Sequence, residues 1–180
     1  MTLLIIDAQR DYFTGGAYPL VGVEAAGHVI AAALADARRR GERIVHVQHL
    51  EQDAEAGFLV AGTDGAEIHP VAAPLAGETV VTKALPNAFA GTSLAAELGS
   101  ATADPLTIAG FMTSMCVDAS TRAALDLGFD VSVVADGCAA PDLEYGGTAV
   151  DGRTVHTAFL AALRDAGARV VPLAEVAAAG

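Results

Sequence analysis

Residues 3–6 are LLII, residues 24–40 are EAAGHVIAAALADARRR and residues 44–47 are IVHV, and this succession decides the fold. The first and third segments are short apolar runs without the polar alternation of a strand that faces water, which is typical of strands buried on both faces. The middle segment is rich in Ala and is followed by Gly41, as helices often are. A buried strand, a helix and a second buried strand predict a right-handed βαβ crossover in a parallel sheet.

The same alternation continues along the rest of the chain. Further strands are expected at residues 79–82, 106–109, 131–135 and 170–171. Further helices are expected at residues 117–127 and 155–166, each followed by a glycine. The 180 residues therefore predict one α/β domain over residues 1–180, a Rossmann-like three-layer αβα sandwich with a mostly parallel six-stranded sheet.

Composition and charge exclude several classes of partner. Ten Lys and Arg residues against 22 Asp and Glu residues give a formal net charge of −12, and so acidic a chain lacks the basic stripe that binds nucleic acid or an anionic membrane. The apolar run at residues 3–6 is too short to cross a membrane. The two cysteines, Cys116 and Cys138, form no disulfide framework, which suits a reducing compartment. We therefore expect a cytoplasmic protein that acts on a small molecule.

Three chemically useful side chains fall at the ends of predicted elements. Asp7 and Lys83 each follow a predicted strand, and Cys116 opens the helix after the fourth strand and a turn. Parallel sheets bind ligands beyond the carboxyl ends of their strands, so we expect these three side chains to meet in one crevice. The segment at residues 50–77 shows little periodicity and is expected to be a long ordered excursion over the same rim.

These residue types suit nucleophilic catalysis. A cysteine attacks as the thiolate, and a helix N-terminus beside a cation lowers the pKa of a thiol, so Cys116 near Lys83 is predicted to be activated in this way. Asp7 would orient the pair and move a proton to a leaving nitrogen, and free backbone N–H groups before Cys116 would form an oxyanion hole. This arrangement predicts hydrolysis of a C–N bond through a thioester. The alternative is that Asp7 forms a turn, Lys83 lies on the surface and Cys116 fills a core.

Longer motifs add a family resemblance to this interpretation. The motifs are IIDAQRDYF at residues 5–13, VTK at 81–83 with NAFAGT at 87–92, GFMTSMCV at 110–117, TRAALDLG at 121–128 and VVADGCA at 133–139. In order and spacing they resemble the isochorismatase-like cysteine hydrolase superfamily, which includes nicotinamidases, N-carbamoylsarcosine amidases and streptothricin hydrolase. The resemblance runs from residue 3 to about residue 176.

The resemblance implies a role for each candidate residue. Cys116 would be the nucleophile, Asp7 the general acid/base and Lys83 the cation that stabilises the thiolate and the intermediate. A cis peptide bond would join Phe111 to Met112, and the amides of Met112 and Cys116 would form the oxyanion hole. The resemblance also implies a homodimer or homotetramer without a cofactor. Members that hydrolyse isochorismate, a vinyl ether, commonly lack the cysteine, so a vinyl-ether hydrolase or a non-catalytic protein of the same fold is the alternative.

A metal site is not expected, although two histidines resemble ligands of the nicotinamidases. His69 matches one of their metal ligands and His49 corresponds to a second. The acidic ligand two residues before the second histidine would fall on Val47, so the Asp-x-His pattern is broken. Two imidazoles alone hold a metal poorly, and we expect them to line or brace the pocket instead.

The remaining candidates concern the substrate pocket. The side chains expected to line it are Gln9, Phe13, His49, Phe89, Thr113 and Met115. Gln9 would share the side of Asp7 if the strand continued, and Thr113 would brace the turn before the nucleophile. Cys138 is expected to be a small packing residue, and His156 a packing or surface residue. Specificity is expected to come from residues 50–77 and 141–152.

Overall fold

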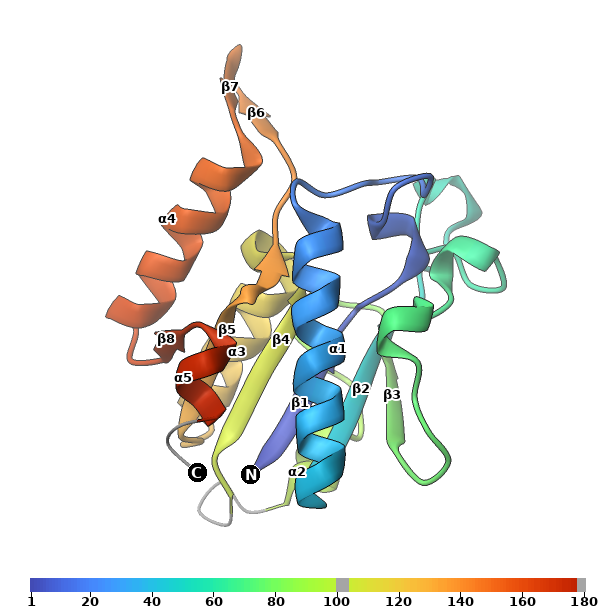
Figure 1. The fold of residues 1–180 in the computed structure, drawn as a ribbon. Helices are drawn as coiled ribbons and strands as arrows, with labels where there is room; N and C mark the ends of the chain where they lie inside the picture. Colours follow the sequence, from blue (N-terminus) through green and yellow to red (C-terminus); the bar gives the residue numbers. More distant parts are fainter. Residues whose placement is uncertain (100–103, 178–180) are drawn as a thin grey trace.

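The computed structural model describes residues 1–99 and 104–177 and confirms the α/β fold (Figure 1). Six strands form one sheet in the order β3-β2-β1-β4-β5-β8. Their bounds are β1 Thr2–Ile6, β2 Arg43–His49, β3 Thr79–Lys83, β4 Leu106–Phe111, β5 Val131–Ala139 and β8 Arg169–Val171. Every pairing in this sheet is parallel, so the sheet is wholly parallel where the sequence predicted a mostly parallel one.

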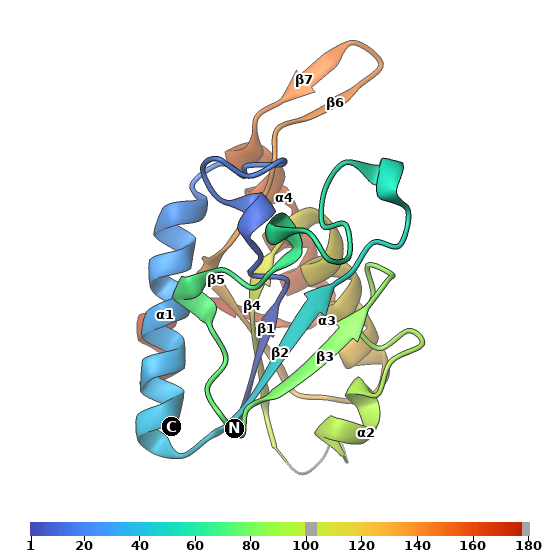
Figure 2. The ribbon, with the colours of Figure 1, turned by 90° about the vertical axis from the view of Figure 1, so that its right-hand side faces the viewer.

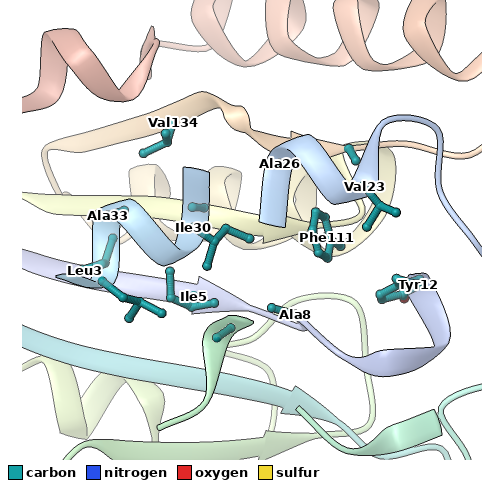
Figure 3. Close-up of a cluster of buried hydrophobic side chains, with 14 of the residues drawn as sticks. Leu3, Ile5, Ala8, Tyr12, Val23, Ala26, Ile30, Ala33, Phe111 and Val134 are labelled. Carbon is teal, nitrogen blue, oxygen red and sulfur yellow. The ribbon is translucent and has the colours of Figure 1, made fainter. Parts of the chain in front are cut away.

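Helices cover both faces of the sheet. They are α1 Val23–Arg40, α2 Leu94–Leu98, α3 Asp118–Asp126, α4 Gly152–Asp165 and α5 Leu173–Ala177. Within β1, Leu3 and Ile5 pack into the core that α1 covers (Figure 3), whereas Leu4 and Ile6 pack into the opposite core with residues of α2, α3 and α4. This two-sided burial explains why β1 is apolar from Leu3 to Ile6. No helix in residues 1–99 and 104–177 has the length and apolarity needed to span a bilayer.

The segment at residues 50–77 is ordered, as expected, and contains three short 3₁₀ turns at Ala54–Ala56, Asp64–Ala66 and Pro70–Ala72. Asp11 anchors this segment to the rest of the domain, because its Oδ2 accepts a hydrogen bond of 2.7 Å from the backbone N–H of Leu59. Gly65 lies so close to this carboxylate that an added Cβ would meet Asp11 Oδ1 at 2.1 Å. The excursion is therefore held both by this buried carboxylate and by the apolar side chains of Leu59 and Ala72, which join the core under α1.

The second region assigned to specificity forms a hairpin of β6 Leu143–Tyr145 and β7 Thr148–Val150. Figures 1 and 2 show it extending away from the rest of the molecule. Gly146 and Gly147 join the two strands, and both have positive φ, as a two-residue type I′ turn requires. The Gly-Gly pair is the sequence signal that marks this hairpin.

The helix predicted at residues 117–127 begins one residue later, as α3 at Asp118. Residues Thr113–Val117 form a π-helical turn that connects β4 to α3. Cys116 therefore lies inside this turn and does not open a regular helix, which corrects the sequence prediction. Short π-helical turns are rare and often occur at functional sites.

Candidate active site

The carboxyl ends of the strands bring the three predicted residues together. Lys83 Nζ lies 2.7 Å from Asp7 Oδ2 and 3.2 Å from Cys116 Sγ. Asp7 is completely buried, and Lys83 and Cys116 are each only 4% exposed. The sheet order accounts for this meeting, because β1 lies between β2 and β4, and β3 lies beside β2. The alternative in which Lys83 is a surface residue is therefore wrong.

His49 is a fourth member of this cluster. It is the last residue of β2, and its Cα pairs with that of Lys83 in the sheet. Lys83 Nζ lies 2.9 Å from His49 Nδ1. The ammonium of Lys83 thus has three acceptors within 3.2 Å, which matches the three protons that an ammonium carries.

The cluster also contains residue types that bind metals. One atom each from Asp7, His49 and Cys116 lie within 4.8 Å of one another, and no other such group of three occurs in the described parts of the chain. The Lys83 ammonium already lies within hydrogen-bonding distance of all three residues, so the charge that a metal would bring is supplied by a side chain.

The second histidine matched to a metal ligand is engaged elsewhere. The ring of His69 stacks on Phe13 with a centroid distance of 3.7 Å, and its Nδ1 accepts a hydrogen bond from the backbone of Val71. Val47, at the position of the acidic ligand, is a buried apolar side chain. These residues do not fit a metal ion of the nicotinamidase kind, because the donor set is incomplete.

Burial dominates the electrostatics of the site. It raises the pKa of Asp7 despite the opposing effect of Lys83. Burial also raises the pKa of the Cys116 thiol, the charge of Asp7 raises it further, and Lys83 only partly offsets the two. The prediction of a lowered thiol pKa is therefore wrong for the free protein. It considered the positive charge of Lys83 but neither the burial of Cys116 nor the negative charge of Asp7 beside it. The raised pKa keeps Cys116 in its thiol form at neutral pH.

The backbone of Asp7 adopts an uncommon conformation. Its φ is +48°, in the left-handed region that residues other than glycine rarely occupy. Hydrogen bonds on both sides hold it, since Asp7 N donates to Val47 O at 3.0 Å and Gln9 N donates to Asp7 O at 2.8 Å. Such a conformation costs about 1–3 kcal/mol and is typical of functional sites, where the surrounding structure maintains it.

Several hydrogen bonds hold the turn that carries Cys116. The peptide bond between Phe111 and Met112 is cis. The carbonyl of Met112 accepts hydrogen bonds from the backbone of Met115 and Val117, at 3.0 and 3.1 Å. Thr113 is fully buried, and its Oγ1 lies 2.8 Å from Nδ1 of His156 in α4. His156, expected to pack or to lie on the surface, therefore braces this turn through Thr113.

Gly110 explains how closely β4 approaches β1 just before this turn. A Cβ at this position would lie 2.0 Å from the carbonyl oxygen of Ile6, and its φ of +130° is also unsuited to other residues. Only glycine lets the strand that leads to Cys116 lie directly against the strand that leads to Asp7.

Gln9 is placed differently from the prediction. It is fully buried, and its Nε2 donates hydrogen bonds to the carbonyls of His49 and Ala66 at 2.8 and 2.7 Å. Its Oε1 accepts a hydrogen bond of 2.9 Å from the backbone of His49. Because its amide is occupied on both sides, Gln9 holds His49 and does not face a substrate.

The aromatic and methionine candidates separate into two groups. Phe13 is buried, stacks on His69 and has its ring centroid 5.7 Å from that of Phe111, so most of its side chain belongs to the core. The cavity that it helps to line with Arg10 and His69 does not include Asp7, Lys83 or Cys116. Met115, the residue before Cys116, is 47% exposed, and Phe89 is half-buried with its ring centroid 6.1 Å from that of Phe129. Of these three side chains, Met115 and Phe89 have surface left for a ligand.

Comparisons with known proteins agree with this geometry. A family model for the isochorismatase domain matches residues 1–175. An isochorismatase family protein of Bacillus subtilis is 39% identical over 161 residues, which cover 89% of each chain. A maleamate amidohydrolase of Pseudomonas putida is 39% identical over 147 residues, which cover 73% of this chain and 68% of the relative.

A solved structure extends the likeness to three dimensions. The crystal structure of a protein from Oleispira antarctica, assigned to the isochorismatase hydrolases, aligns with a TM-score of 0.93 at 46% identity. The alignment covers 98% of this chain and 95% of the solved one. Sequence and structure agree over nearly the whole length, and the chain belongs to the isochorismatase family.

Proposed function

We propose that this protein is a cysteine amidohydrolase that cleaves an amide, carbamoyl or lactam-like C–N bond of a small molecule. The observation that carries the proposal is the buried contact of one ammonium, Lys83 Nζ, with both Asp7 and Cys116. The amidohydrolase activity named for the Pseudomonas putida relative supports it. Both cysteines are free, which supports a reducing, cytoplasmic location for an enzyme that depends on a thiol.

The raised thiol pKa determines the first proton transfer of the proposed reaction. Asp7 removes the proton of Cys116 as Sγ attacks the carbonyl carbon, because the free thiol does not ionise at neutral pH. The carbonyl oxygen becomes an oxyanion, which the amides of Met112 and Cys116 bind. Lys83, beside both Asp7 and Cys116, offsets the negative charge of the intermediate.

The same carboxyl group completes the cycle. Asp7 gives its proton to the leaving nitrogen, the C–N bond breaks, and the amine or ammonia departs from a thioester on Cys116. Water then attacks the thioester while Asp7 accepts one of its protons, and this proton returns to Sγ as the carboxylic acid leaves. Asp7 thus alternates between base and acid within one site, without a cofactor.

A screen of amides tests this proposal. We expect ammonia release from at least one member of a panel that includes maleamic acid and N-carbamoyl amino acids, at a rate at least about 10⁶ times that of the uncatalysed reaction. Consumption of isochorismate without hydrolysis of any amide would favour the vinyl-ether alternative. Inactivity toward both classes would favour a non-catalytic protein.

We also propose that the protein forms a homodimer or homotetramer through its projecting hairpin. Leu143 is 40% exposed and Tyr145 is 91% exposed on this hairpin, and an isolated two-stranded ribbon is only marginally stable in water. We expect light scattering to give a dimer or tetramer for the wild type and a smaller assembly for Tyr145→Ser. The same mass for both proteins, or a wild-type monomer, would contradict this role of the hairpin.

A further inference from the structure

His49 is the member of the buried cluster that the proposed reaction does not use. We infer that His49 is a positioning residue, whose Nδ1 accepts a proton of the Lys83 ammonium and thereby holds Nζ between Asp7 and Cys116. The inference rests on the proposed function in one respect: the benefit of holding Lys83 Nζ beside Cys116 Sγ is that the sulfur reacts. Its geometry stands on the 2.9 Å contact between Lys83 Nζ and His49 Nδ1.

The chemistry of the contact defines one tautomer of the ring. An ammonium has donors and no acceptor, so Nδ1 of His49 must accept and the ring proton must reside on Nε2. Burial and the charge of Lys83 lower the pKa of His49, while Asp7 and Glu51 raise it to a smaller extent. The ring is therefore neutral at pH 7 and can serve as an acceptor.

The position of the ring is built into the fold. The side-chain amide of Gln9 binds both the N–H and the carbonyl of His49, at 2.9 and 2.8 Å. On the next strand, the carbonyl of Lys83 accepts a hydrogen bond of 2.8 Å from the backbone of Leu50. These hydrogen bonds fix the main chain at His49 and at Lys83. The imidazole and the ammonium are therefore held at a fixed position relative to each other.

Removal of the acceptor should weaken the contact between Lys83 and the nucleophile. One proton of a buried ammonium would then have no partner, and buried donors that lose a partner are strongly disfavoured. The long Lys side chain would be free to turn toward another acceptor. Cys116 would lose part of the stabilisation that Lys83 gives its thiolate.

Two similar substitutions separate this role from simple packing. The amide oxygen of His49→Asn can occupy the place of Nδ1, whereas that of His49→Gln reaches toward the place of Nε2. The measurement is the rate at which iodoacetamide alkylates Cys116, resolved by mass spectrometry between pH 6 and 10. At each pH below the pKa of Cys116, we expect the alkylation rate of the Asn variant to lie within about threefold of the wild-type rate. We expect the alkylation rate of the Gln variant to be about tenfold lower than the wild-type rate.

Cys138 serves as an internal control in the same samples. It is fully enclosed and burial raises its pKa to about 12, so its alkylation reports on opening of the fold. Variants are compared only where Cys138 stays unreactive. Equal rates for the Asn and Gln variants would overturn the inference, because packing alone does not distinguish the two ends of the ring.

The tautomer is a second readout that needs no substrate. Long-range proton–nitrogen NMR of the labelled protein should show His49 protonated at Nε2 and unprotonated at Nδ1. A proton on Nδ1 would overturn the inference. Since neither measurement involves turnover, an unsuccessful amide screen would count against the proposed function and leave this test of His49 intact.

Discussion

Replacing Cys116 with alanine is expected to lower amide turnover by at least about 10⁴-fold while the protein stays folded. The substitution removes the atom that forms the thioester. The residual activity would come from substrate binding and from the oxyanion hole alone. Lys83 and Asp7 stay paired at 2.7 Å, so the fold loses only one small buried side-chain group. Steady-state ammonia release gives the turnover, and a thermal melt reports on the fold.

Cys138→Ala is the matched control for this prediction. Cys138 is as deeply buried as Cys116 and packs in the same core, but it lies on β5 and has no contact with Lys83 among the hydrogen bonds of the described residues. We expect it to keep turnover within about threefold of the wild type. More than a tenth of wild-type activity in Cys116→Ala, or a comparable loss in Cys138→Ala, would remove Cys116 from the role of nucleophile.

The sequence was sufficient to predict the large sheet because its central strands, such as β1 and β4, are buried along their whole length. These strands are nearly continuous apolar runs, and helices end at residues such as Gly41, so the apolar pattern and the helix-ending residues predict the same elements. The hairpin at β6 and β7 was missed because its strands are only three residues long and mostly exposed, so they give no apolar run. Its Gly146-Gly147 turn was the available signal.

Some features of the candidate site could likewise be predicted from the sequence and others could not. Asp7, Lys83 and Cys116 could be placed together because the carboxyl ends of parallel strands share one edge. The roles of Gln9 and His49 could not be predicted, since they depend on hydrogen bonds between strands whose register the sequence does not specify. The direction of the thiol pKa was missed for a related reason, because burial is a property of the whole fold.

Replacing Lys83 with methionine is expected to lower the free energy of unfolding by about 3–5 kcal/mol at pH 8. Methionine keeps most of the apolar stem of lysine, so the core is preserved while the charge is lost. Asp7 is completely buried and would face that core as a carboxylate without its cation. Urea denaturation of the wild type and the variant measures the difference.

This loss should grow with pH, because it depends on the ionisation of Asp7. Burial already raises the pKa of Asp7, and removing Lys83, which opposes burial, raises it further. A carboxyl group whose pKa is higher in the folded state adds stability below its unfolded value of about 4, and this contribution is lost as the pH rises through the folded value. Lys83→Met should therefore approach the wild type near pH 4 and fall behind it toward pH 8.

The double variant Asp7→Asn/Lys83→Met separates the charge from the packing. It removes the carboxylate together with its cation, so we expect it to recover most of the stability lost by Lys83→Met at pH 8, with Asp7→Asn completing the cycle. A single Lys83→Met variant as stable as the wild type at pH 8 would mean that Asp7 is neutral in the folded protein. In that case Asp7 could not accept the proton of Cys116, and the first step of the proposed reaction would need another base.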